Sequence, residues 1–194
     1  MSSQSLPQTP TTAHSTIGDT AILGNPTFAL VCSVSCPGNV VLRAYDLAVA
    51  LRDAGITVIG GFHSPMEQEI LSILLRGTQP IVVCPARGVD GMRVPTALRA
   101  SLAEGRLLLL SPFTGKQRRA TAELADERNR FVAAQATHVF IAYAAPGGKT
   151  EGLCREVLSW GKPVYTFDSP SNAHIIEMGA VSVTGDADWV RSLN

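Results

Sequence analysis

Hydrophobic residues along this chain follow two alternating patterns. Short, continuous apolar runs are typical of strands that are buried on both faces of a sheet. Such runs lie at residues 28–32, 56–61, 81–84, 106–111, 138–143 and 163–168, and a last, short strand is expected at 181–183.

The segments between these runs have helical periodicity, and several begin at proline or end at glycine. They lie at residues 40–55, 65–77, 95–105, 121–137, 150–161 and 172–180, of which 121–137 has room for one or two helices. Strands that alternate with helices predict right-handed βαβ units. We therefore expect an α/β domain with a Rossmann-like, doubly wound, mostly parallel sheet and helices on both faces.

The beginning of the chain has a different composition. Residues 1–24 are expected to form a flexible tail, because the segment opens with many Ser, Thr, Pro and Gln residues, and the domain itself is expected at residues 25–194. The first residues lack the apolar core of a secretory signal, and no run approaches the roughly 18 apolar residues of a membrane span. We expect no membrane association.

The cysteines and the charges narrow the function further. Cys32, Cys36, Cys84 and Cys154 contain no CxxC pair, which indicates a reducing, cytoplasmic setting and no zinc site. The chain has 16 Lys and Arg against 16 Asp and Glu, so no overall basic field attracts nucleic acid. Any site for a polyanion must therefore be local.

Ligands of a parallel α/β sheet bind beyond the carboxyl ends of the strands. The loop after the first strand reads SVSCPGN, in which Ser33, Ser35 and backbone amides either hold a phosphate or form a plain turn. It contains neither GxGxxG nor a P-loop, which disfavours classical dinucleotide or NTPase binding.

Two glycine-containing loops offer further candidates. Gly60 and Gly61 permit a ligand to approach the backbone closely, and His63 either bonds a phosphate or caps the next helix. Glu67, on that helix, is expected on its solvated face. In the later loop, Gly147, Gly148, Lys149 and Thr150 open a helix where amides, ammonium and hydroxyl could converge on an anion, although glycines are also common in such turns.

The segment from Lys116 to Arg130 is the most basic part of the chain. Within it, Arg128, Asn129 and Arg130 precede an apolar helical run. Helical spacing prevents Arg128 and Arg130 from both pointing inward. We expect one arginine to reach the site and the other to pair with Asp126 or Glu127.

The order of these motifs resembles the DNA-processing protein A family (DprA, also called Smf). The resemblance runs from about residue 27 to 184 and rests on several motifs. These are Arg128-Asn129-Arg130 with its apolar helix, strand and Gly-rich turn, WGKPVYTF, Gly88-Val89-Asp90 with Val94-Pro95, LLLLSPFTG and NAHIIEMGA. The family's Gly-Ser-Arg after the first strand is absent, and we expect the chain to correspond to the family's Rossmann core alone.

The resemblance implies a protein that binds single-stranded DNA, protects it and assists the loading of a RecA-type recombinase as a homodimer. It implies that Arg128 and Arg130 contact phosphates and that Asn129 fixes the turn or touches the ligand. No catalytic residue, metal or cofactor is expected.

The wider superfamily (SLOG) provides an alternative. Its lysine-decarboxylase-like phosphoribohydrolases carry PGGxGTxxE, which Pro146-Gly147-Gly148-Lys149-Thr150-Glu151 echoes with one glycine missing and the glutamate shifted. A nucleotide-binding sensor or a nucleoside-monophosphate phosphoribohydrolase is therefore the second hypothesis. A scaffold subunit that uses Trp189 as a contact is a third, although Trp189 is equally suited to packing.

Overall fold

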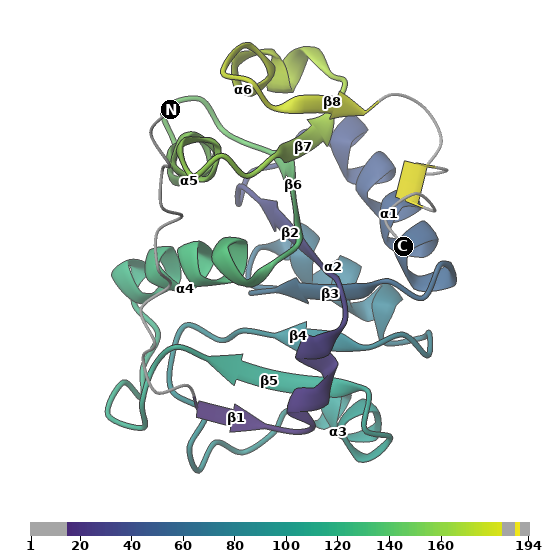
Figure 1. Ribbon diagram of the computed structural model, residues 1–194, viewed down its shortest axis with the longest axis vertical. Helices are drawn as coiled ribbons and strands as arrows, with labels where there is room; N and C mark the ends of the chain where they lie inside the picture. The colour runs from purple at the N-terminus through teal and green to yellow at the C-terminus, as the bar shows by residue number, and fades with distance from the viewer. Residues whose placement is uncertain (1–14, 184–188, 191–194) are drawn as a thin grey trace, which may run out of the picture.

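The computed structural model describes residues 15–183 and 189–190, which form one eight-stranded sheet in the order β1-β5-β4-β3-β2-β6-β7-β8 (Figure 1). All neighbouring strands are parallel except β1, which runs antiparallel to β5. The strands are β1 (Ser15–Ile17), β2 (Thr27–Cys32), β3 (Thr57–Gly60), β4 (Ile81–Val83), β5 (Leu107–Ser111), β6 (His138–Tyr143), β7 (Val164–Phe167) and β8 (Val181–Val183).

Helices cover both faces of the sheet, and Figure 1 shows α4 and α1 on opposite sides. One hydrophobic cluster joins the sheet to α1, α2 and α3, and a second joins it to α4, α5 and α6. The helices are α1 (Gly38–Asp53), α2 (Pro65–Leu74), α3 (Thr96–Ala103), α4 (Ala122–Gln135), α5 (Lys149–Ser159) and α6 (Ala173–Glu177), with short 3-10 helices η1 (Thr20–Gly24) and η2 (Pro170–Asn172).

The continuous apolar runs form strands because each run supplies side chains to both clusters. In β2, Phe28 and Leu30 enter the first cluster, while Ala29 and Val31 enter the second. A strand with two buried faces has no polar position, so its sequence shows no alternation. The expected doubly wound α/β fold and each expected strand and helix are confirmed, and residues 121–137 contain a single helix.

The expectation of a flexible tail is wrong for residues 15–24, which contain β1 and η1. Ser15 pairs with Ser111 and Ile17 with Leu109 across the antiparallel β1–β5 ladder. The Ser15 hydroxyl donates to the Phe113 carbonyl at 2.7 Å and accepts from the Val89 amide at 3.0 Å. These partners lie far away in sequence, so local composition gave no indication of the strand. Residues 1–14, the rest of the expected tail, lie outside the described part.

The order in which strands are added to the sheet changes direction between β2 and β6. Strands β3, β4 and β5 follow one another on one side of β2, and strands β6, β7 and β8 follow one another on its other side. Such a switch point usually opens a crevice beyond the carboxyl ends of the two strands. Within residues 15–183 and 189–190, no helix has the length and apolar character required to cross a membrane. Trp189 stacks on Phe140 at 5.7 Å between ring centroids, so it packs against the sheet.

Candidate nucleic-acid interface

Helix α4 carries Arg128 on the same buried face as Phe131 and Val132. The helix begins at a capped residue, since the Thr121 hydroxyl accepts from the Leu124 amide at 3.2 Å. Its other end is held by Lys162, whose ammonium donates to three backbone carbonyls at 2.7–2.9 Å, those of Ala133, Ala134 and Ala136. Both ends of the helix are therefore fixed, and Arg128 is presented from a rigid element.

The Arg128 side chain reaches the carboxyl ends of β3 and β4 and is only 3% exposed. Its Nη1 donates to the Cys84 carbonyl at 2.8 Å, and its Nε donates to the Asn129 side chain at 2.8 Å. The guanidinium lies directly against Gly61, where any Cβ would overlap it. Gly61 is required because the arginine occupies the space of a side chain.

Among the described residues, the Arg128 guanidinium lacks an ion pair, and one of its nitrogens lacks a hydrogen-bond acceptor. No carboxylate there lies within 4.0 Å of its guanidinium, and Nη2 makes no hydrogen bond. Burial lowers the pKa of Arg128, and the negative charge of Glu67 opposes this shift. Within the part of the chain that the structure describes, Arg128 is therefore a buried cation without an ion pair, at the carboxyl end of the sheet.

Glu67 organises the loop that faces this arginine. The expectation of a solvated Glu67 is wrong, since the residue is 6% exposed. Its carboxylate accepts from the amides of Cys32 and His63 at 2.9 Å and from that of Ser64 at 3.2 Å. Ser64-Pro65-Met66-Glu67 is a capping box, which the S-x-x-E spacing could have revealed.

The loop between β3 and α2 also contains strained backbone. Phe62 has φ of 47°, in the left-handed region that non-glycine residues rarely adopt, and its side chain is buried. His63, the next residue, is exposed, and Ser64 caps α2 in its place. Any contact between His63 and a phosphate stays a prediction.

The outer side of α4 has a different electrostatic character. A cavity of about 210 Å³ lies between α4 and α5 and brings together Asn129, Arg130 and Lys149. Both cations are already paired: Arg130 Nε lies 2.7 Å from Glu156, and Lys149 Nζ lies 2.7 Å from Asp126. The expected partner of the outward arginine, Asp126 or Glu127, is therefore wrong. The groove is close to neutral.

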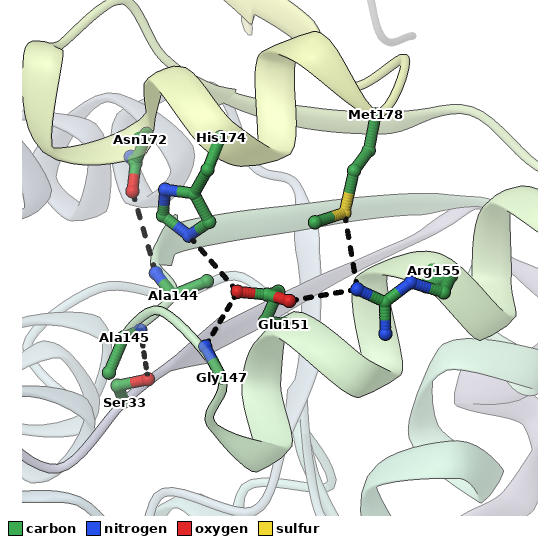
Figure 2. A network of polar contacts seen from close by, with 9 residues as sticks. All are labelled: Ser33, Ala144, Ala145, Gly147, Glu151, Arg155, Asn172, His174 and Met178. Carbon is green, nitrogen blue, oxygen red and sulfur yellow. Dashed lines mark hydrogen bonds and ion pairs between the residues drawn. The ribbon is translucent and has the colours of Figure 1, made fainter.

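The Gly-rich turn after β6 is held by contacts within the chain (Figure 2). The Gly147 amide donates to Glu151 at 2.7 Å, which lowers the pKa of that carboxyl, and Arg155 donates to the same carboxylate at 2.8 Å. The Ala145 amide donates to the Ser33 hydroxyl at 2.9 Å, which ties the turn to the loop after β2. This bond spans the switch point.

Asn172 supports the same turn and was not foreseen as a site-forming residue. Its side chain is fully buried, donates to the Ala142 carbonyl at 2.9 Å and the Thr166 hydroxyl at 2.8 Å, and accepts from the Ala144 amide at 3.4 Å. Its position in the NAHIIEMGA motif was the available signal.

The sequence of the chain matches the family model of DNA recombination-mediator protein A over residues 3–194. The chain belongs to this family. No curated protein sequence matches it.

Two solved structures of the family share the fold. DNA processing protein A of Helicobacter pylori superimposes with a TM-score of 0.74 at 18% identity, over 92% of this chain and 85% of that one. The Streptococcus pneumoniae protein gives 0.72 at 18% identity, over 89% of this chain and 63% of that one, so this chain spans less than two thirds of its length. A molybdenum cofactor carrier protein of Chlamydomonas reinhardtii gives 0.60 at 15% identity, over 87% of this chain and 97% of that one.

In this member of the DNA recombination-mediator protein A family, the structure places the expected site residues other than His63 in three groups. Arg128 lies with Gly60 and Gly61 at the ends of β3 and β4. Asn129, Arg130 and Lys149 line the outer groove. Ser33 contacts the turn that contains Gly147 and Gly148, Ser35 is exposed in the neighbouring loop, and Thr150 is buried.

Proposed function

We propose that the chain binds single-stranded DNA through backbone phosphates, with Arg128 as the central contact. The observation that carries this proposal is the buried guanidinium without an ion pair in the described part of the chain. A buried charge is costly unless it is paired and hydrogen-bonded. A phosphate oxygen would supply both the opposite charge and an acceptor for Nη2.

Family membership supports a nucleic-acid ligand, and the Helicobacter pylori relative has a described single-stranded DNA binding mode. The two proteins share a fold at 18% identity. Aromatic residues make up only 6% of this chain, which limits stacking on bases. Phosphate contacts would therefore dominate, and affinity would depend little on base sequence.

The test is fluorescence anisotropy with labelled single-stranded and duplex oligonucleotides over a salt series, with AMP as competitor. Preference for single strands and a fall in log affinity of about 0.7 per log unit of salt for each contacted phosphate would support the proposal. The absence of DNA binding, with AMP still raising the melting temperature, would favour the nucleotide-sensor alternative instead.

We also propose that the chain protects DNA, assists recombinase loading and forms homodimers, as family membership suggests. Nuclease protection, strand exchange with a RecA-type recombinase and light scattering test these three properties separately. The phosphoribohydrolase alternative stays a prediction, and release of free base from nucleoside monophosphates would support it. Against it, the Glu151 carboxylate is bound by Gly147 and Arg155.

A further inference from the structure

Two loops at the carboxyl ends of β4 and β5 concentrate positive charge. Residues 85–94 and 112–120 contain five cations and one acidic residue, Asp90, a net charge of +4 in a chain whose net charge is zero. The cations are Arg87, Arg93, Lys116, Arg118 and Arg119.

The structure joins these loops into one surface. The Gly88 amide donates to the Gln117 carbonyl at 2.9 Å, and the Ser111 hydroxyl donates to the Arg87 carbonyl at 2.7 Å. Gly88 lies against the backbone of Thr114 so closely that no side chain fits there. Arg87 is therefore held beside the segment that carries Lys116, Arg118 and Arg119.

These cations differ from those of the outer groove. In the described part of the chain, none of the five forms an ion pair, whereas Arg130 and Lys149 each do. Lys116, Arg118 and Arg119 are exposed. Asp90 faces Gly115. An exposed, unneutralised cluster of this kind attracts polyanions locally even when the whole protein is neutral.

The cluster is continuous with the Arg128 site. Arg128 donates to the Cys84 carbonyl, and Cys84 immediately precedes the loop of residues 85–94. Neighbouring strands lie about 4.8 Å apart, so the ends of β3, β4 and β5 span roughly 10 Å. Phosphates of a stacked strand lie about 3.4 Å apart, so a dinucleotide at Arg128 would not span these ends, whereas a strand of five or more nucleotides would.

We propose that the joined loops 85–94 and 112–120 form a second phosphate-binding surface, which carries a single strand from Arg128 across the ends of β4 and β5. This proposal rests on the proposed function. It places the path of the strand over the unpaired cations and away from the groove between α4 and α5.

The test compares two variants that each lose two arginine charges. Arg118→Gln with Arg119→Gln removes charge from the proposed surface. The control, Arg52→Gln with Arg76→Gln, removes the same charge near the ends of α1 and α2. Anisotropy is measured with labelled thymidylates of two and about 20 nucleotides, of which only the longer one spans both the Arg128 site and the joined loops.

For the long oligonucleotide, the loop variant should bind about tenfold more weakly at low salt, with a salt slope reduced by about 1.4. The short oligonucleotide should bind both variants like the unaltered chain. Equal effects of the two variants, an unchanged slope with the long oligonucleotide, or an equal loss with both lengths would overturn the second surface. If the unaltered chain binds no single strand, the proposed function itself fails.

Discussion

The inner and outer sides of α4 show two different uses of arginine. Arg128, on the inner side, is buried and has no ion pair among residues 15–183 and 189–190, whereas Arg130, on the outer side, is exposed and paired with Glu156. Two helical positions that are two residues apart point about 200° away from each other. The surroundings therefore decide which cation is available to a ligand.

Neutralisation distinguishes the two sides more clearly than the number of cations. The outer groove contains two cations, but both already contact carboxylates. Exposed pairs of this kind contribute only about 0–1 kcal/mol to stability. On the inner side, the cost of burying the Arg128 charge is offset by two hydrogen bonds and by the more distant charge of Glu67, but by no ion pair among the described residues. Mutations that remove the inner cation, or that free the outer cations from their carboxylates, therefore test this comparison.

The largest effect is expected for Arg128→Met, with Arg130→Met as its matched control. Affinity for single-stranded DNA should fall about 10- to 100-fold for the first and less than about twofold for the second, because a hydrogen bond to a charged group contributes about 1.5–3 kcal/mol. Anisotropy measures both. Equal losses would show that the two sides are equivalent.

Arg128→Met should leave the unliganded chain close to its original stability. Loss of the hydrogen bond to the Cys84 carbonyl is offset by removal of a buried charge, so we expect a change below about 1.5 kcal/mol in the free energy of unfolding. Urea denaturation checks this, and a large destabilisation would identify Arg128 as mainly structural.

A smaller loss, about tenfold, is expected for Gly61→Ala, because the added methyl group displaces a guanidinium that forms charge-assisted hydrogen bonds. Gly152→Ala is the control, since a Cβ at Gly152, which lines the outer groove, meets open space. In the Arg128→Met background, Gly61→Ala should cost no further affinity. Additive losses would separate Gly61 from the arginine.

Releasing the cations of the outer groove should have a modest effect. Asp126→Asn with Glu156→Gln frees Lys149 and Arg130, and we expect affinity to change by at most about fivefold. Asp46→Asn with Glu177→Gln makes the same charge change at exposed positions elsewhere. A much larger gain for the first variant alone would place the DNA in the groove.

The smallest effect concerns Glu151, a carboxylate that serves the fold. Its pKa is lowered mainly by the Gly147 amide, so its stabilising contribution is present above its ordinary value of 4.5 and is lost as pH falls through the lower, folded-state value. Glu151→Gln should remove that part of the pH dependence. Melting temperatures between neutral and acidic pH measure it, and identical profiles for both proteins would contradict the assignment.

The strands and helices were predictable because each continuous apolar run or periodic segment carries its own signal. The sequence also indicated that only one of Arg128 and Arg130 faces inward, but not which one. That depends on Gly61 and Cys84, which α4 meets only in the folded chain. Glu156 as the partner of Arg130 likewise depends on the packing of α4 against α5, and β1 depends on an edge of β5 that local sequence does not reveal.

The short strand β1 has a consequence for how the protein is handled. It covers the backbone edge of β5, whose sequence is LLLLS. An uncovered edge of four leucines would be a template for pairing between molecules. A recombinant version trimmed to residue 25, where composition alone would begin the domain, is therefore expected to aggregate, while one that begins before Ser15 keeps its edge covered.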